Sequence, residues 1–413
     1  MKLKIMIMAL LLMSVGIGSA VNWLPESTME PGANLSYYDS GSSLQTFDFS
    51  TEPADGSVLV SISGIWSVLA GKYLNGDIVI GPASDTYSFL YDYTTDGVDD
   101  CIEIQDAIDN IGTHGDIVFE PGIYNLTNTI TCKPGVRLLG KGNVFHPWPN
   151  AAHIYIDPDP IPRRVTFQIT NETDPAFVMS SGKTGITIEN IAFYYPNQSV
   201  DSVVEYPATI SGSEWYSIEI TLRNLFAINP YIFVYMPRGD RIIIENVKGQ
   251  PIKTGIYIGT TQDVPYIRHV HFSPHFWEAE LEGSASRIYR YQNGTAFHLG
   301  RINWPSVIDI FAFGYKYGVY MDTTRDGRFT GIALDVCKYP VYMQDSSRNI
   351  ISGGQLVQYS QYIGVPHPGD GAAIEIDGGA NNIIIGNVIR YKNAGIIDGG
   401  TSTISEHNQI IAL

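Results

Sequence analysis

The chain has 413 residues, 44% of them hydrophobic, and a formal net charge of −17. Enough apolar surface is available for a large core, which excludes a disordered chain. The negative charge argues against a general binder of nucleic acid or of anionic membranes, so a polyanionic ligand would need a local cluster of basic side chains.

Residues 1–20 have the pattern of a secretory signal peptide. Two lysines precede a short apolar run, and the segment ends in small residues, with cleavage predicted near Ala20. The run is too short for a comfortable membrane span, and an uncleaved anchor is the alternative interpretation. We therefore expect a secreted or cell-surface protein with no stable membrane span after removal of the leader.

Residues 21–93 alternate Ser, Gly, Pro and Thr with short apolar runs. This pattern predicts an N-terminal arm or a small β-rich region, with a boundary near residue 94. The composition of the region does not indicate what it does.

Residues 96–142 predict a short helix followed by strands. Apolar side chains recur at helical spacing from Ile102 to Ile111, Gly112 ends the helix, and the β-branched strand Ile117–Phe119 follows. This order, with the EPGIYNL turn and the GVRLLGKG strand, resembles the N-terminal cap and first coils of the pectate-lyase-like superfamily. The resemblance implies an all-β fold over residues 94–413, a single-stranded right-handed parallel β-helix, or solenoid, with an N-terminal capping α-helix.

A second pattern, two short strands joined by a polar corner, recurs after residue 116. The corner residues Asn190, Asn224, Asn246 and His269 are separated by intervals of 34, 22 and 23 residues. These intervals predict coils of about two dozen residues, in which each strand pairs in parallel with its counterpart one coil later, at a spacing of ~4.8 Å. Asparagine tolerates the left-handed conformation of a corner, so these residues need no catalytic role.

The chain has three cysteines. Cys101 begins the predicted helix and Cys132 begins a strand of the first coil, so in an exported protein the two residues either form a disulfide or remain free. Cys337 lies in an apolar strand, and we interpret it as a buried thiol.

Residues 265–330 form the densest candidate site, with seven of the 25 basic residues and four of the nine histidines. Its GTAFHLGRINWPSVIDIFAFGYKYGV block, with HVHFSPHFW before it, resembles secreted bacterial β-helix proteins of the rhamnogalacturonase and epimerase-like branch. The resemblance implies a polysaccharide or other glycan as the partner, and no nucleic acid. Aromatic rings offer flat platforms for sugars, and guanidinium groups bind their acidic groups. The candidate substrate-binding residues are Trp277, Trp304, Tyr317, Arg325 and Arg328.

A glycoside hydrolase needs two carboxyl groups across the scissile bond. Asp309 and Asp335 are 26 residues apart, about one coil, so one interpretation stacks them near each other, or near Asp322 or Asp326 of the intervening loop, as an acid beside a base. The alternative is that both are solvated corners or partners of nearby arginines. Asp99 and Asp100 precede the predicted helix, where we expect them to cap it.

A polysaccharide lyase needs a cation that neutralises a uronate and a base that removes the neighbouring proton. Arg301 or Arg328 is the candidate cation, and His271, His275 or Tyr317 is the candidate proton acceptor or donor. The histidines also fit an alternative interpretation as ordinary outward strand residues. Their spacing suggests zinc only weakly, because no further matched ligand follows.

No cofactor is required by these patterns, and we assign no metal to the candidate site. Asp370, Glu375 and Asp377 are compatible with Ca²⁺, although turn chemistry explains the same residues. The adhesion-like tripeptide Arg238-Gly239-Asp240 falls at a predicted turn, where Gly and Asp are favoured anyway.

Two hypotheses follow. The first is a secreted carbohydrate-active enzyme, a lyase or a glycoside hydrolase, that acts on an acidic polysaccharide at residues 265–330. The second is a non-catalytic surface protein, either a glycan-binding adhesin or a tailspike-like rod. In the second hypothesis residues 21–93 serve for attachment or for assembly of a homotrimer.

Overall fold

The computed structural model describes residues 77–82, 91–145, 164–179, 183–278, 283–358 and 371–413, and the backbone of four strands between residues 34 and 69. Contacts divide the chain into two compact units, residues 1–75 and residues 76–413. In the first unit, β1 (Asn34–Tyr38) pairs antiparallel with β2 (Leu44–Asp48), and β3 (Val58–Ile62) pairs antiparallel with β4 (Ile65–Leu69). The predicted leader lies outside the described residues.

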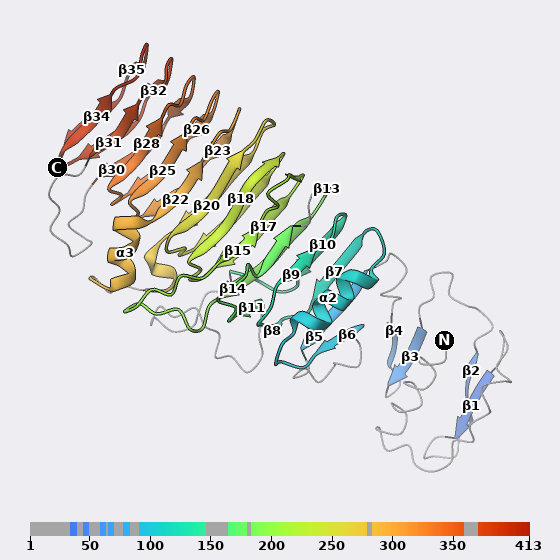
Figure 1. Ribbon diagram of the computed structural model, residues 1–413. Helices are drawn as coiled ribbons and strands as arrows, with labels where there is room; N and C mark the ends of the chain where they lie inside the picture. The colour runs from blue at the N-terminus through green and yellow to red at the C-terminus, as the bar shows by residue number, and fades with distance from the viewer. Residues whose placement is uncertain are drawn as a thin grey trace. The chain divides into compact units, whose positions relative to one another are not determined.

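The second unit is a stack of coils (Figure 1). Each regular coil passes through one strand of a second sheet, turns, and then passes through two short strands of a first sheet that are separated by a corner. A strand pairs in parallel with its counterparts in the coils before and after it, as β25 (Tyr317–Asp322) does with β22 and β28. The fold predicted from the sequence, a parallel β-helix made by a single chain, is confirmed.

The first sheet carries the two strands that flank each corner. Its strands are β5 (Ile78–Pro82), β6 (Tyr93–Thr95), β7 (Gly115–Phe119), β8 (Gly122–Leu126), β10 (Val136–Gly140), β11 (Val165–Ile169), β14 (Thr187–Tyr194), β17 (Thr221–Ala227), β19 (Ile243–Gly249), β21 (Tyr266–Phe272), β23 (Ser306–Ile308), β24 (Phe311–Phe313), β26 (Arg328–Thr330), β27 (Ala333–Asp335), β29 (Ile350–Ser352), β30 (Gln355–Gln358), β32 (Ile383–Ile385), β33 (Val388–Tyr391), β35 (Ile404–Glu406) and β36 (Gln409–Ala412).

The second sheet carries the remaining strand of each coil, with a short side pair, β13 and β16, at one edge. Its strands are β9 (Ile130–Cys132), β12 (Phe177–Met179), β13 (Lys183–Thr184), β15 (Ala208–Ser211), β16 (Ser217–Ile218), β18 (Ile232–Asp240), β20 (Thr254–Thr260), β22 (Thr295–Leu299), β25 (Tyr317–Asp322), β28 (Tyr339–Gln344), β31 (Ala372–Asp377) and β34 (Ala394–Asp398).

The corners of the first sheet have the left-handed conformation that the sequence predicts. Asn190, Asn224, Asn246 and His269 have φ values between 52° and 61°. Asn246 Nδ2 donates a hydrogen bond of 2.8 Å to Asn224 Oδ1, so the amide of one corner bonds to the corner of the previous coil. In later coils the corner recurs every 22 residues, at Asp309, Gly331 and Gly353.

The core consists of inward columns of apolar side chains, one residue from each coil. In the second sheet Val234, Ile256, Phe297, Val319 and Val341 follow one another in register, and all are fully buried. Burial of apolar area stabilises the stack by about 25 cal/mol per Å². The core therefore holds each coil in a fixed register with the next, which fixes the outward side chains as well.

The predicted helix is α2 (Cys101–Asn110), which buries Ile104, Ala107 and Ile108 in the core. Gln105 contacts strand β9, because its Oε1 accepts a hydrogen bond of 2.8 Å from the backbone N–H of Thr131. The carboxylates before the helix do not cap it, contrary to expectation. Asp100 instead accepts hydrogen bonds from the backbone N–H groups of Gly97 and Asn125, at 2.7 and 2.6 Å.

Cys101, Cys132 and Cys337 are free thiols, so the disulfide alternative for the first two is wrong. Cys101 Sγ donates to the carbonyl oxygen of Asn128 at 3.1 Å, and Cys132 lies in an inward position of β9. Cys337 is buried, as the sequence indicates. Burial raises the pKa of all three thiols to about 12.

An insertion between β21 and β22 contains η3 (Pro274–Phe276) and α3 (Ala285–Asn293). A buried ion pair holds it, because Arg290 lies 3.4 Å from Glu278 and both side chains are fully buried. The Arg290 guanidinium also lies 5.4 Å from the ring centroid of Tyr315. Gln250 Oε1 accepts hydrogen bonds of 3.1 Å from the backbone N–H groups of Trp277 and Glu278.

The first strand of the solenoid lies before the expected boundary at residue 94. β5 pairs in parallel with β7 over Ile78–Ile80, and the contacts divide the chain after Asn75. Thus some residues of the expected N-terminal arm belong to the first sheet. Among the described residues no helix is long and apolar enough to cross a membrane.

Candidate functional site

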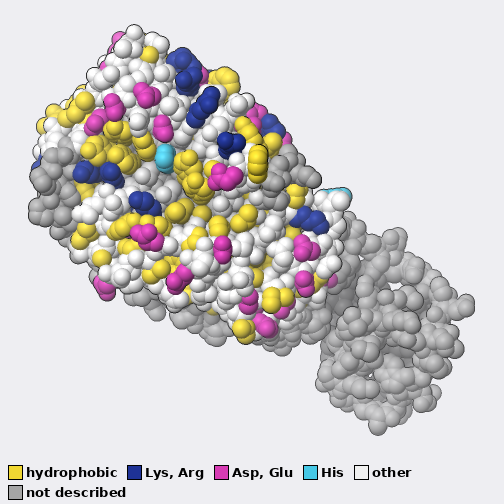
Figure 2. All heavy atoms as spheres, in the orientation of Figure 1, with side chains coloured by type: hydrophobic (Ala, Val, Ile, Leu, Met, Phe, Trp, Pro, Cys, Tyr) yellow, Lys and Arg dark blue, Asp and Glu magenta, His cyan; other side chains and the backbone are white. Residues whose placement is uncertain are grey.

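The outer face of the second sheet carries a column of aromatic side chains, with one residue from each of five successive coils. Hydrophobic side chains, tyrosine included, gather over this sheet in Figure 2. Neighbouring ring centroids in the column lie 4.6–5.5 Å apart. We name this column the aromatic ladder; its members are Tyr235, Tyr257, His298, Tyr320 and Tyr342.

Two of the four neighbouring ring pairs in the aromatic ladder are stacked, and the other two are T-shaped or tilted. Tyr235 stacks on Tyr257 at an interplanar angle of 21°, and His298 stacks on Tyr320 at 27°. Burial lowers the pKa of His298 to about 4, so its imidazole is neutral near pH 7. The ring contacts link successive coils, and each ring is half-buried, so the ladder offers a sugar only part of a ring face.

Polar groups lie at one end of the ladder. The Tyr320 hydroxyl donates to Gln344 Oε1 at 2.6 Å, and the Tyr342 hydroxyl donates to Asp377 Oδ2 at 3.2 Å. Burial and the contact with Asp377 raise the pKa of Tyr342 to about 12. Tyr342 is therefore a neutral hydrogen-bond donor at physiological pH.

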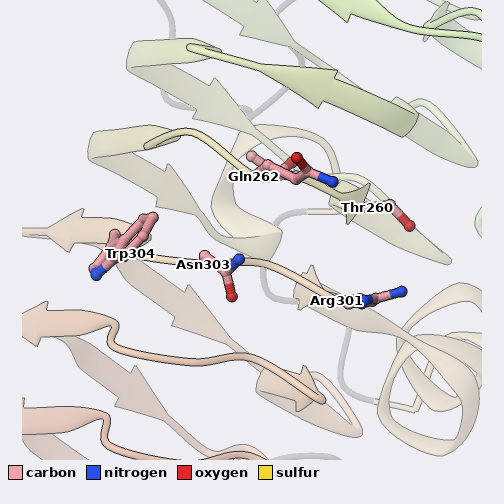
Figure 3. Close-up of a pocket in the computed structure, with 6 residues that line it drawn as sticks. Thr260, Gln262, Arg301, Asn303 and Trp304 are labelled. Carbon is pink, nitrogen blue, oxygen red and sulfur yellow. The ribbon is translucent and has the colours of Figure 1, made fainter.

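A surface hollow of about 270 Å³ lies where β20 and β22 end. In Figure 3, Thr260 and Arg301 lie at one end of it and Trp304 lies at the other, with Gln262 and Asn303 between them. The hollow is smaller than the roughly 300–1,000 Å³ of pockets that enclose whole drug-sized molecules. It therefore suits one residue of a chain-like ligand better than an enclosed small molecule.

Backbone contacts between two coils shape the hollow. The backbone N–H of Thr261 donates to the carbonyl oxygen of Arg301 at 3.0 Å, and that of Asn303 donates to the carbonyl oxygen of Thr261 at 3.2 Å. A Cβ atom at Gly300 would lie 3.1 Å from the Cα of Gly259. Two glycines in register thus allow the coils to approach closely beside the hollow.

Trp304 has an unusual backbone conformation for a bulky residue. Its φ is 54°, its side chain is 53% exposed, and its N–H donates to the carbonyl oxygen of Arg325 at 2.8 Å. A left-handed backbone is unfavourable for a bulky side chain, and such strain concentrates at functional sites. The following coils have left-handed residues at the corresponding turn, namely Asp326, Arg348 and Asn381.

The guanidinium of Arg301 has no ion-pair partner among the described acidic side chains. Six of the twelve other described arginines lie in ion pairs. In a chain with a net charge of −17, an exposed and unneutralised arginine beside a hollow is available to an anionic ligand. The paired arginines are Arg137, Arg223, Arg241, Arg268, Arg290 and Arg348.

The hollow combines an aromatic ring, a cation, two side-chain amides and two hydroxyl groups. These groups bind a polar ring that has an apolar face and an anionic substituent. The hollow is lined by no carboxyl, imidazole or phenol group. It therefore supports binding and offers no general acid or base of its own.

The structure brings together three of the ten candidate residues of the sequence analysis. Arg301 and Trp304 line the hollow, and Arg325 lies one coil further, in a bridge with Asn303. Two candidates lie on other faces. Arg328 begins β26 in the first sheet, and Tyr317 lies on the outer face of the second sheet, where its ring stacks on Tyr320 at 5.1 Å.

His271 lies on the outer side of the first sheet, where its ring contacts Phe276 and Phe311 edge to face, at 5.2 and 4.6 Å. Burial, with the charge of Lys248, lowers its pKa. His275 follows in η3, with its ring 6.5 Å from Phe313. His271 is in the first sheet and His275 is in η3, whereas Arg301 follows β22 of the second sheet, and neither histidine lines the hollow with Arg301.

Trp277 and Asp335 are two further candidates from the sequence analysis. Trp277 packs partly buried against the core, so it does not offer an open platform for a sugar. Asp335 ends β27, where burial raises its pKa. A carboxyl of raised pKa suits a general acid, but no described acidic side chain pairs with it as the second carboxyl of a hydrolase.

The expected stacking of Asp309 on Asp335 is wrong. The coil in this region is 22 residues long, so Asp309 corresponds to Gly331, and Asp335 corresponds to Phe313. Asp309 is a left-handed corner residue, 3.7 Å from His269. The 26 residues between Asp309 and Asp335 exceed the 22-residue coil by four, so the two side chains lie in different parts of the coil.

Sequence reasoning missed the aromatic ladder. The signal was present, because the segments YGVYMD at 317–322 and YPVYMQ at 339–344 repeat at the coil period of 22 residues. Residues 22 positions apart occupy corresponding places in successive coils, so this repeat aligns Tyr320 with Tyr342 and Tyr317 with Tyr339.

No group of three or more His, Cys, Asp or Glu side chains that could hold a metal ion occurs among the described residues. Of the Ca²⁺ candidates, Asp370 lies outside the described residues, whereas Glu375 and Asp377 are both in β31.

Comparisons with solved structures agree with the fold. The DFA-IIIase from Arthrobacter chlorophenolicus A6 in complex with GF2 matches with a TM-score of 0.54 and 12% identity, over 81% of this chain and 88% of that chain. The Dettilon tailspike protein matches at 0.45 and 13%, over 81% and 68% of the two chains. The Streptococcus pneumoniae surface adhesin PfbA matches at 0.41 and 12%, over 76% and 90%.

No protein-family model matches the sequence, and no curated protein matches it either. The structural similarity shows the fold alone. This protein is a right-handed parallel β-helix, as its resemblance to the pectate-lyase-like superfamily implied.

Proposed function

We propose that this protein binds a glycan at the edge of the second sheet, outside the cell or on its surface. The observation that carries the proposal is the hollow that the unneutralised Arg301 and the exposed Trp304 line at opposite ends. Strain in the backbone of an exposed tryptophan, at a turn where other coils use smaller or more polar residues, is explained if the ring contacts a ligand.

A glycan fits this chemistry better than other ligand classes. A sugar ring has an apolar face for the indole and hydroxyl groups for the amides of Gln262 and Asn303. Arg301 adds a partner for a carboxylate or a sulfate, which favours an acidic polysaccharide. The negative charge of the whole chain disfavours nucleic acid.

The non-catalytic hypothesis accounts for the hollow best. A lyase built from Arg301 with His271 or His275 would need these groups around one sugar, and neither histidine lines the hollow with Arg301. The hollow is lined by no group that could take up a proton. We therefore place binding, and not cleavage, at Arg301 and Trp304.

A glycoside hydrolase is the second candidate, favoured by the carboxylates on the outer face of the second sheet. Asp322 and Asp377 occupy the same outward column two coils apart, with Gln344 between them. Residues two coils apart in one column are separated by about 9.6 Å. This spacing is close to the roughly 6.5–9.5 Å between the carboxyl groups of inverting enzymes. Cleavage would then require both carboxylates.

Incubation with acidic and neutral polysaccharides separates the two candidates. The purified protein is assayed for new reducing ends and for the absorbance of unsaturated uronates, and its binding to the same polysaccharides is measured by calorimetry. We expect binding without product. New reducing ends that disappear in both Asp322→Asn and Asp377→Asn would establish the hydrolase, and failure to bind any polysaccharide would refute the proposal.

We further propose that residues 1–20 are a cleaved leader and that residues upstream of the solenoid form an attachment or trimerisation arm. Sequencing of the mature N-terminus and light scattering of the secreted protein test these two points.

We also propose that α2 caps the solenoid, supported by the bonds between Gln105 and the backbone of Thr131 on β9. Gln105→Ala should then increase hydrogen exchange at β9.

A further inference from the structure

The most exposed large hydrophobic side chain among the described residues is Trp215, at 75%. It lies in the turn between β15 and β16, which hydroxyl contacts hold in place. The N–H of Trp215 donates to Ser213 Oγ at 3.1 Å, and the N–H of Ser213 donates to the Oγ of the buried Ser217 at 3.0 Å. The indole is thus presented to solvent by an ordered turn.

Strand register places Trp215 on the same edge of the second sheet as the hollow. Ser217, two residues after Trp215, pairs with Gly239 at the end of β18. Arg238 pairs with Thr260, a residue of the hollow, at the end of β20. Trp215 therefore lies at the carboxyl ends of the strands, as Arg301 and Trp304 do.

The two tryptophans are three coils apart along the solenoid, through β16, β18, β20 and β22. Three coils correspond to about 14 Å along the solenoid axis. Trp304 also lies at the opposite end of the hollow from Thr260 and Arg301, so the two tryptophans are offset across the edge as well. Their separation exceeds a single sugar residue and suits a short oligosaccharide that runs along the solenoid. Trp215 and Trp304 are both strongly exposed, at 75% and 53%, whereas the described rings of the aromatic ladder are half-buried.

Two arginines lie along the same edge. Arg238 and Arg301 are two coils apart, about 10 Å, and neither has an ion-pair partner among the described acidic side chains. A charge-assisted hydrogen bond spans only about 2.7–2.9 Å. Each guanidinium is thus positioned to bind its own anionic group on a ligand that extends along the edge.

Carboxylates accompany the arginines. Glu214 precedes Trp215 and lies near the aromatic ladder, because burial and then the charge of Glu214 raise the pKa of Tyr235. Burial and then the charge of Asp322 likewise raise the pKa of Tyr320. Carboxylates accept hydrogen bonds from sugar hydroxyls, so a ligand of this edge carries free hydroxyls as well as anionic groups.

We propose that Trp215 and Arg238 form a second subsite, so that the edge from Trp215 to Trp304 binds one linear acidic oligosaccharide lying along the solenoid axis. This inference rests on the proposed function, because the hollow at Trp304 supplies the first subsite. It adds that affinity depends on ligand length, since only an oligosaccharide that spans three coils reaches both tryptophans.

Calorimetry with di- and hexasaccharides of polygalacturonate, alginate and chondroitin sulfate tests the inference. For at least one of these glycans, the wild-type protein should bind the hexasaccharide at least tenfold more tightly than the disaccharide. Trp215→Ala and Arg238→Ala should each reduce this ratio to within threefold while leaving disaccharide binding unchanged. The matched controls are Tyr266→Ala, an aromatic residue of the first sheet that is 45% exposed, and Arg390→Ala, an exposed arginine of the same sheet.

The outcomes distinguish the two proposals. If the wild type binds both lengths and Trp215→Ala keeps the full length dependence, the second subsite is refuted and the hollow at Trp304 stands. If the wild type binds none of the probes, the proposed function itself fails. Circular dichroism and thermal melting of each variant show that the exposed substitutions leave the fold intact.

Discussion

Replacement of Trp304 by asparagine separates a binding role from a structural one. Asparagine adopts the left-handed conformation readily, so Trp304→Asn relieves strain worth roughly 1–2 kcal/mol. Trp304 has φ 54° and is 53% exposed, so about half of its side chain is covered. Removing roughly 100 Å² of buried ring surface at 25 cal/mol per Å² costs up to about 2.5 kcal/mol.

These two effects nearly cancel. We expect the free energy of unfolding of Trp304→Asn to fall by about 1 kcal/mol, because area-based estimates of burial are upper limits. The effect on binding is larger, since truncation of a central tryptophan in a binding site costs about 2 kcal/mol, or close to thirtyfold in affinity. Stability and affinity thus respond differently to the same substitution.

Two measurements make the comparison, urea denaturation for stability and titration calorimetry with an acidic hexasaccharide for affinity. Trp304→Phe keeps an aromatic face and should retain affinity within about tenfold of wild type. Unchanged affinity in Trp304→Asn would refute the binding role. A loss of stability above about 4 kcal/mol would show that the ring is a structural element.

Further predictions concern stability and reactivity. Burial acts to raise the pKa of Glu245, but the hydrogen bond and charge of Arg268, with Arg223, outweigh it and hold the pKa below its ordinary value. The stabilisation is therefore present above pH ~4.5 and is lost as the pH falls below it, and Glu245→Gln should flatten this part of the curve of melting temperature against pH. Arg290→Ala leaves Glu278 buried without its partner and should destabilise the fold by about 3–5 kcal/mol in chemical denaturation. The three buried thiols, with pKa values raised to about 12, should not react with a thiol reagent in the native protein and should all react after unfolding.

Contrary results are equally specific. An identical pH profile for wild type and Glu245→Gln would show that the ion pairs on the first sheet contribute nothing. If Arg290→Ala melted with the wild type, the insertion would not depend on its ion pair. Fewer than three reactive thiols in denaturant without reductant would indicate that a disulfide exists after all.

Most of the fold was predictable because the solenoid repeats its physical requirements in every coil. Inward apolar columns and left-handed corners recur at a nearly constant interval, so Asn224 and Asn246 were recognised as corners from spacing alone. The predicted helix was equally clear, since its apolar stripe, including Ile104 and Ile108, is local in sequence.

The site was predictable only in part, because neighbours in space are set by the coil period. Arg301 and Trp304 lie three residues apart within one turn, so both were found among the residues of one short sequence segment. The same segment, residues 265–330, also contained His271 and Asp309. In the structure His271 lies in strand β21 and Asp309 at a corner, away from the hollow. Trp215 lies 89 residues before Trp304 in the sequence and was missed, although strand register places both on one edge.

A crystal structure with a bound acidic hexasaccharide tests the central claim most directly. We predict that the ligand lies along the carboxyl edge of the second sheet, with one sugar ring against Trp304, an acidic group at Arg301 and the chain extending towards Trp215. A ligand bound at His271 and His275 on the outer side of the first sheet, or across the coils without contact to Trp304, would contradict this account.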